Sequence, residues 1–495
     1  MSNTREIATQ ILTDIYLKFE FFETAVLLSK NFSRLNQRDK AFVRYLVLNT
    51  LRRNGQVDKV LNDYVKIPIK KKNFYILNLL RLSICQILFL DIKDYSIVNT
   101  AVEISKNYKV DKFVNGLLRN ICRNKYKILE NLDHTTNIPN WIKHDIIQNL
   151  GKETLEKISK RVINEPSLNI KIKANCLKEK NWEKLLNGKF ILDDLLKTQN
   201  DGLIEKKPYF NEGDWWVQNI SSTLPVKFIS RIFNNVDKSK ISVLDVGAAP
   251  GGKTFQLIEE NFNVKSLEIS QRRIRRLKKN LQRLKFETEI ICEDFLNYEC
   301  SNLFDCILID APCSASGLMQ KKPEILIRNK EKNIEKLIVK QQKMLEKSKH
   351  LLKIGGYIVY CVCSIHSSEG SYQIENFLRK NKNFRIIEFN NNVSNFGKYL
   401  KKGMLTVIPG DFGDNAEADA AFGTAVVVTD DSQGDATEVL VTATSGALTI
   451  SGAGDDKMTF FQIFRDVSDA NDDMAADARL VGIQLFFTTD ATNDA

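Results

Sequence analysis

The chain has 495 residues, 43% of them hydrophobic and 27% charged, so it can form folded cores and is not intrinsically disordered. Its net charge of +11 is unevenly spread, because residues 404–495 hold 17 acidic and three basic side chains, which leaves 44 acidic and 69 basic ones in residues 1–403. The excess of basic side chains in residues 1–403 favours a polyanionic partner such as nucleic acid. The alternative is that these side chains only keep the protein surface solvated.

Neither a secretory signal nor a membrane span is predicted. Residues 1–10 are polar and charged, and the most apolar stretch, residues 76–92, contains Asn78, Arg81 and Asp91, as a buried amphipathic helix would. All nine cysteines precede residue 404, mostly in apolar runs typical of reduced thiols. We therefore expect a soluble cytoplasmic protein.

Residues 1–128 are predicted to form an all-α domain. Apolar residues recur at helical spacing, first at Ile7, Ile11 and Ile15 and last around Leu117 and Ile121. Residues 129–205, which contain two prolines in a polar setting, are expected to be a linker and small RNA-binding region.

Residues 206–408 alternate between short apolar runs and longer helical ones, which predicts a Rossmann-like α/β domain with a parallel sheet. The expected strands are residues 242–246, 265–269, 289–292, 305–309 and 357–361, and a helix reaching Leu352 should stop at Gly355-Gly356. Ligands of such a sheet bind at the carboxyl ends of its strands.

Residues 409–495 differ in composition from the rest and contain β-type runs. We predict an acidic β-rich segment there. A fused module, an artefact of joining, and an intramolecular mimic of RNA are the interpretations left open.

The first motif follows the first expected strand. Residues 247–254 satisfy the phosphate-loop pattern, with Gly247, then Gly252-Lys253-Thr254, and an NTPase is therefore a competing interpretation. Glu268 ends the next expected strand and Asp294 follows the one after it, where these acids suit a ribose and an adenine edge better than a polyphosphate. These acids favour S-adenosylmethionine as the ligand, unless they are ordinary polar residues at strand ends.

Two cysteines follow the last two expected strands, Cys313 after Asp310-Ala311-Pro312 and Cys363 before Ser364. Cytosine C5 becomes nucleophilic when a thiolate adds to C6, and a carboxyl such as Asp310 can favour that addition by binding the N3/N4 edge. The alternative is that both cysteines are small buried hydrophobic residues. A zinc site is not expected, because no second close cysteine pair accompanies Cys361 and Cys363.

At these residues the sequence resembles the Sun/RsmB-type family of RNA cytosine-C5 methyltransferases, over about residues 1–408. The motifs that carry the resemblance are residues 248–254, Glu268 with Arg273, Asp294, residues 310–313, and Cys363-Ser364 with Glu369. Residues 98–103 and 113–119 resemble helices of the NusB-like RNA-binding module.

The resemblance implies a monomeric, metal-free enzyme that uses S-adenosylmethionine to methylate a cytosine of 16S rRNA. It implies that Cys363 is the nucleophile, that Cys313 helps to release the product, and that Asp310 assists. The donor would be bound by Ala248, Ala249, Pro250, Gly251, Gly252, Lys253, Glu268, Arg273, Asp294 and Asp310. A catalytically impaired RNA-binding or assembly factor remains the alternative to the enzyme.

The chain departs from the family pattern at three places. Gly247 stands where the family usually has Cys, and Val362 where it has Thr. Residues 404–409 fit the segment before the strand that normally closes the sheet, but that strand has only a faint counterpart at residues 419–422, and residues 425–428 are the expected substitute. Without a substitute, one edge of the sheet would be open.

Overall fold

The computed structural model describes residues 4–66, 73–199, 202–328, 331–387 and 406–409. The chain divides into two compact units, Met1–Phe412 and Gly413–Ala495, and the second lies wholly outside the described residues. The β-type runs expected in the acidic tail, including residues 425–428, therefore lie outside the described part.

The N-terminal part is helical, as expected, and its helices pack into two adjoining cores. Its helices are α1 (Thr4–Lys18), α2 (Phe22–Leu28), α3 (Lys30–Ser33), α4 (Gln37–Arg52), α5 (Asn54–Tyr64), α6 (Phe74–Phe89), α7 (Asp94–Lys106), α8 (Asp111–Arg123) and α9 (Lys125–Glu130). Helix α6 is buried on nearly all sides, and its Arg81 pairs with Asp58 at 2.7 Å. The most apolar stretch of the sequence is therefore a helix buried in the protein core. Among the described helices, none is both long and apolar enough to cross a membrane.

Two helices and a small sheet follow. Helices α10 (Asn140–Leu150) and α11 (Lys152–Val162) precede strands β1 (Leu168–Ile172), β2 (Gly188–Leu192), β3 (Leu195–Thr198) and β4 (Trp215–Val217), with α12 (Trp182–Leu185) between β1 and β2. The strands are antiparallel in the order β2-β3-β1-β4 and pack on Trp182 and Trp215. Because β4 pairs with β1, this sheet spans the expected domain boundary at residue 205.

The larger sheet has the order β10-β9-β8-β5-β6-β7. Its strands are β5 (Ser242–Val246), β6 (Asn263–Leu267), β7 (Glu289–Ile291), β8 (Phe304–Asp310), β9 (Leu352–Cys361) and β10 (Thr406–Pro409). All neighbours pair in parallel except β9 and β10. The strand order reverses beside β5, whose neighbours are β6 and β8, and such a switch point is where open α/β sheets bind ligands.

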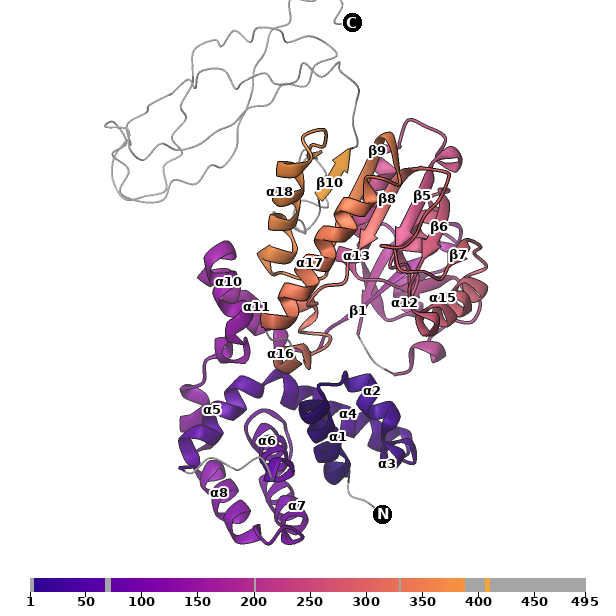
Figure 1. The fold of residues 1–495 in the computed structure, drawn as a ribbon. Coiled ribbons are helices and arrows are strands. Elements are labelled where there is room, and N and C mark those ends of the chain that lie inside the picture. Colours follow the sequence, from indigo (N-terminus) through magenta and orange to yellow (C-terminus); the bar gives the residue numbers. More distant parts are fainter. Residues whose placement is uncertain (1–3, 67–72, 200–201, 329–330, 388–405, 410–495) are drawn as a thin grey trace, which may run out of the picture. The chain divides into compact units, whose positions relative to one another are not determined.

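Helices cover both faces of this sheet (Figure 1). They are α13 (Ile220–Ile232), α14 (Gly252–Glu259), α15 (Gln271–Leu284), α17 (Glu331–Ser348) and α18 (Ser371–Lys380), whereas the short α16 (Ile325–Arg328) packs with α4 and with the core of α10 and α11. Alternate residues of β8 enter different cores: Ile307 and Ile309 pack with α17 and α18, whereas Cys306 and Leu308 pack with α13 and α14. This alternation is the two-residue period of a strand buried on both faces.

One expectation about this sheet needs correction. The expected helix ends at Ser348, and β9 begins at Leu352 and runs through both glycines. Gly355 has φ +75°, and pairing with β8 jumps from Leu352 to Tyr357, so the glycines form a bulge inside a strand rather than ending a helix. Beyond β9, the antiparallel β10 pairs with residues 357–360, whereas the expected substitute strand, residues 425–428, lies outside the described residues.

Candidate active site

The loop after β5 and the end of β8 approach each other closely at the switch point. Gly247 has φ +80°, and a Cβ atom there would lie 2.8 Å from the backbone oxygen of Asp310. The loop then enters α14 at Gly252, so free backbone N–H groups of the helix N-terminus open towards the same end of the sheet. Ala248, Ala249 and Gly251 are buried.

The two polar side chains of the phosphate-loop pattern are engaged within the protein. Lys253 Nζ pairs with a carboxylate oxygen of Asp310 at 2.7 Å. The buried Thr254 hydroxyl donates to Asp245 Oδ2 at 2.6 Å, and burial raises the pKa of Asp245 to about 6. A phosphate loop would use this lysine for phosphate oxygens and this hydroxyl for Mg²⁺. The contacts therefore disfavour the NTPase interpretation.

The two acids after β6 and β7 differ in their surroundings. Glu268 is buried, accepts a hydrogen bond from the Ser270 N–H at 3.0 Å, and pairs with Arg273 at 3.0 Å. Arg273 also donates to the backbone oxygen of Ala249, which joins the loops after β5 and β6. Asp294 is more exposed and lies 3.5 Å from Lys340 of α17.

The thiols of Cys313 and Cys363 meet at this end of the sheet, with their sulfur atoms 3.2 Å apart. A hydrogen bond from the Cys313 thiol lowers the pKa of Cys363, although burial acts in the opposite direction. The same contact, together with burial, raises the pKa of Cys313. Among nearby charges, Asp310 raises the pKa of Cys363, while Lys253 and Lys322 lower it. Cys363 is therefore favoured as the thiolate of the pair.

Serine hydroxyls hold the two cysteine loops together. Ser364 Oγ lies 3.1 Å from Ser314 Oγ and 2.9 Å from Ser316 Oγ, and the Gly317 N–H donates to the Cys363 carbonyl at 2.9 Å. Sequence analysis did not identify Ser314 or Ser316 as site residues. The one available signal was the repeated Cys-Ser pair after two neighbouring strands.

Glu369 lies beneath these loops and is fully buried. One of its carboxylate oxygens accepts hydrogen bonds from the Ser314 N–H at 2.8 Å and from Gln341 Nε2 at 3.1 Å, and Gln341 also donates to the Pro312 carbonyl at 2.9 Å. Glu369 thus ties the segment after Cys363 to the loop of Cys313. Gln341, on α17, carries no motif that could have identified it.

The third cysteine of this region is a packing residue. Cys361 is buried in the core beneath β9, and burial raises its pKa to about 12. The described residues contain no group of three or more His, Cys, Asp or Glu side chains that could hold a metal ion.

Comparison with known proteins identifies two families along the chain. Residues 232–423 match the model of the 16S rRNA methyltransferase RsmB/F family, and residues 2–123 match that of the NusB family. The chain is therefore similar to the NusB family over its N-terminal residues and to the RsmB/F methyltransferase family further along.

Curated relatives match most of the chain. One is the probable ribosomal RNA small subunit methyltransferase B of Synechocystis, 27% identical over 83% of this chain and 96% of the relative. Another is the ribosomal RNA small subunit methyltransferase B of Proteus mirabilis, 29% identical over 71% of this chain and 85% of the relative. The crystal structure of PH0851 covers 83% of this chain and 98% of its own, with a TM-score of 0.62 and 20% identity, and so shares its fold.

Proposed function

We propose that this protein transfers a methyl group from S-adenosylmethionine to C5 of a cytosine in 16S rRNA, through a covalent bond between Cys363 and C6. The observation that carries the proposal is the pair of thiols 3.2 Å apart at the switch point, beside the carboxylate of Asp310. The family match supports the coarser part of the proposal, methylation of ribosomal RNA.

The residues at the carboxyl ends of β5 to β8 suit S-adenosylmethionine. Gly247 lets the loop after β5 lie against the end of β8, and the buried Glu268, whose two carboxylate oxygens are held by the Ser270 N–H and by Arg273, is joined through Arg273 to that loop. We assign residues 248–253 to the methionine end, Glu268 with Arg273 to the ribose, and Asp294 to the adenine. When bound, S-adenosylmethionine supplies an electrophilic methyl group.

The two thiols would activate the cytosine for methylation and then release the methylated cytosine. The Cys363 thiolate forms a bond to C6, and the electrons of the C5–C6 double bond make C5 nucleophilic, with Asp310 binding the N3/N4 edge. After C5 is methylated, a base takes its proton and the C5–C6 double bond re-forms. The electrons of the C6–S bond then return to Cys363. We assign Cys313 to this release step.

A flipped cytosine must enter beside these thiols, while the rest of the RNA is held elsewhere. We assign RNA binding to the NusB-family domain, residues 1–128, and to the region 129–205. Their contacts would be made mainly to phosphates, in keeping with the positive charge of the first 403 residues.

The test is a denaturing gel of the wild type, Cys313→Ala and Cys363→Ala after incubation with small-subunit rRNA and methyl donor. We expect Cys313→Ala to accumulate a denaturation-resistant protein–RNA adduct, because release is blocked, and Cys363→Ala to form none. Cys361→Ala is the matched control, since this buried thiol belongs to the core. Nucleoside analysis of the wild-type product should give 5-methylcytosine.

Each other outcome would change the proposal. An adduct that requires Cys313 would exchange the two roles. No adduct and no methylated nucleoside, with donor and RNA both bound, would contradict the enzyme and favour an RNA-binding or assembly factor.

A further inference from the structure

Helix α10 lies between the two family matches, yet it contacts both cysteine loops. Its buried Ile142 and Ile146 share a core with Met319, and Ile365 packs against the same core. Met319 follows the Cys313 loop, and Ile365 is two residues after Cys363. One face of α10 therefore rests on the two segments that carry the thiols.

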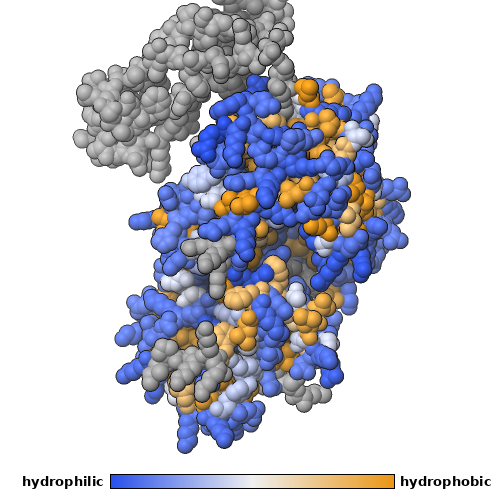
Figure 2. All heavy atoms as spheres, viewed as in Figure 1, coloured by the Kyte–Doolittle hydropathy of each residue, from blue (hydrophilic) through white to orange (hydrophobic). Residues whose placement is uncertain are grey.

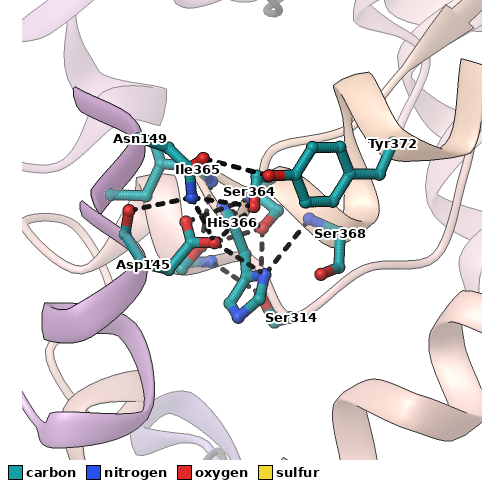
Figure 3. A network of polar contacts seen from close by, with 10 residues as sticks. Asp145, Asn149, Ser314, Ser364, Ile365, His366, Ser368 and Tyr372 are labelled. Atoms are coloured by element: carbon teal, nitrogen blue, oxygen red, sulfur yellow. Dashed lines mark hydrogen bonds and ion pairs between the residues drawn. The ribbon is translucent and has the colours of Figure 1, made fainter. Parts of the chain in front are cut away.

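The polar residues of α10 bind the segment after Cys363 directly (Figure 3). Asp145 Oδ2 accepts a hydrogen bond from the Ser367 N–H at 3.1 Å, and Asp145 Oδ1 accepts one from the Ser367 hydroxyl. Asn149, one helical turn later, donates to Ser367 Oγ at 3.2 Å and accepts from the Tyr372 hydroxyl at 3.1 Å. The Asp145 side chain is only 11% exposed, so these are largely buried contacts.

The same segment is held from its other side by the Cys313 loop. The Ile365 N–H donates to Ser316 Oγ at 2.9 Å, and the His366 N–H donates to Ser364 Oγ at 3.0 Å. His366 Nδ1 lies 3.6 Å from Asp145. The backbone after Cys363 is thus fixed between Ser316 of the neighbouring loop and the Asp145 carboxylate of α10.

We propose that Asp145 is a positioning residue for Cys363: by binding Ser367 it fixes the loop that keeps the Cys363 thiol against that of Cys313. The proposal rests on the proposed function for its catalytic meaning. The carboxylate is suited to the role because it can accept two hydrogen bonds at once from the backbone and hydroxyl of one residue. Asp145 lies within helix α10, whereas Ser367 begins a short 3₁₀ turn after the Cys363 loop.

The first readout needs neither RNA nor methyl donor. The pH dependence of Cys363 alkylation by iodoacetamide, followed by peptide mass spectrometry, reports the thiolate and hence the hydrogen bond from Cys313. In Asp145→Ala we expect the midpoint to move to higher pH, because the loop is released. Asp145→Asn, which keeps one acceptor for the Ser367 N–H, should show a smaller shift.

The second readout is the rate of RNA adduct formation in a Cys313→Ala background. Displacement of a reacting group by about 1 Å can cost about 100-fold, so we expect Asp145→Ala to slow the adduct about tenfold or more, with RNA affinity unchanged. Ser367→Ala should give the same defect, and the double variant no additional one, because both remove one contact.

Two controls separate positioning from general loss of stability. Ile146→Val weakens the apolar packing of α10 but keeps the carboxylate, and Glu153→Ala removes an exposed acid from the neighbouring helix. Both should leave the alkylation midpoint unchanged. An unchanged midpoint in Asp145→Ala would overturn the proposal. If the wild type forms no adduct, the proposed function fails, while the alkylation result still decides the role of Asp145.

Discussion

At the scale of single residues, the two thiols are not equivalent even though each is the partner of the other. Cys363 is exposed and Cys313 is more buried, and their contact lowers the pKa of Cys363 while it raises that of Cys313. A thiolate stabilised by a donated hydrogen bond forms at a lower pH than an isolated thiol. This asymmetry supports Cys363 as the nucleophile, independently of the family resemblance.

Replacing Cys313 with alanine should therefore slow the alkylation of Cys363 at neutral pH. The variant loses the hydrogen bond that lowers the pKa of Cys363, so the midpoint of the pH–rate profile should rise. Iodoacetamide labelling from pH 6 to 10, followed by peptide mapping, would measure this midpoint. The control variant Cys361→Ala should leave the pH–rate profile of Cys363 unchanged. A midpoint that falls in Cys313→Ala would contradict the direction of this hydrogen bond.

At the scale of elements, alternating apolar runs and helical periodicity were sufficient to predict the helical domain and the five parallel strands. The small β1–β4 sheet was not predicted, because its strands are three to five residues long and lack a clear period. The cysteines could be placed at strand ends, but the contact between Asp145 and Ser367 joins residues 222 apart and leaves no local pattern. Contacts of this kind depend on the folded arrangement of several elements.

Replacing either of two glycines with alanine should change the stability of the protein, but in opposite directions. Gly251 caps α14 with φ +117°, and a Cβ atom there would lie 2.0 Å from the ring of the buried Phe255. Gly251→Ala should destabilise the protein by about 2–5 kcal/mol and abolish donor binding. Gly116, within α8, has open space, so Gly116→Ala should stabilise it by up to about 1 kcal/mol.

Thermal unfolding and calorimetric titration with the methyl donor would measure both effects. Normal donor binding by Gly251→Ala would mean that the loop after β5 tolerates a side chain and is not the binding element.

At the scale of the whole molecule, charge is the property most relevant to a large RNA substrate. Hydrophilic residues cover most of the face seen in Figure 2. Helix α15 contains no acidic residue and presents exposed cations: Arg272, Arg273, Arg275, Arg276, Lys278 and Lys279. Of these, Arg273 is already paired with Glu268. The others are available to follow a phosphate backbone near the donor site.

Affinity for rRNA should fall steeply with salt, and neutralising part of α15 should reduce that dependence. For single-stranded RNA each phosphate contact contributes about −0.7 to the slope of log K against log salt, so Arg275→Gln with Arg276→Gln should flatten it by about 1.4. Binding titrations from 50 to 300 mM KCl would measure the slope. Lys240→Gln with Lys382→Gln, an equal loss of exposed charge elsewhere, is the control. If both double variants showed the same slope of log K against log salt, α15 would not contact the RNA.

The short distance between the two sulfurs has a consequence for oxidative chemistry. Hydrogen peroxide would oxidise the Cys363 thiolate to a sulfenic acid, and attack by the Cys313 thiol would then form a disulfide; overall, two thiols and one peroxide give one disulfide and two waters. Peroxide should therefore abolish adduct formation, and dithiothreitol should restore it, while Cys361 stays reduced because it is buried. Intact-mass and peptide analysis would detect the loss of two hydrogen atoms. Methylation by this protein would then depend on the redox state of the cell that makes it.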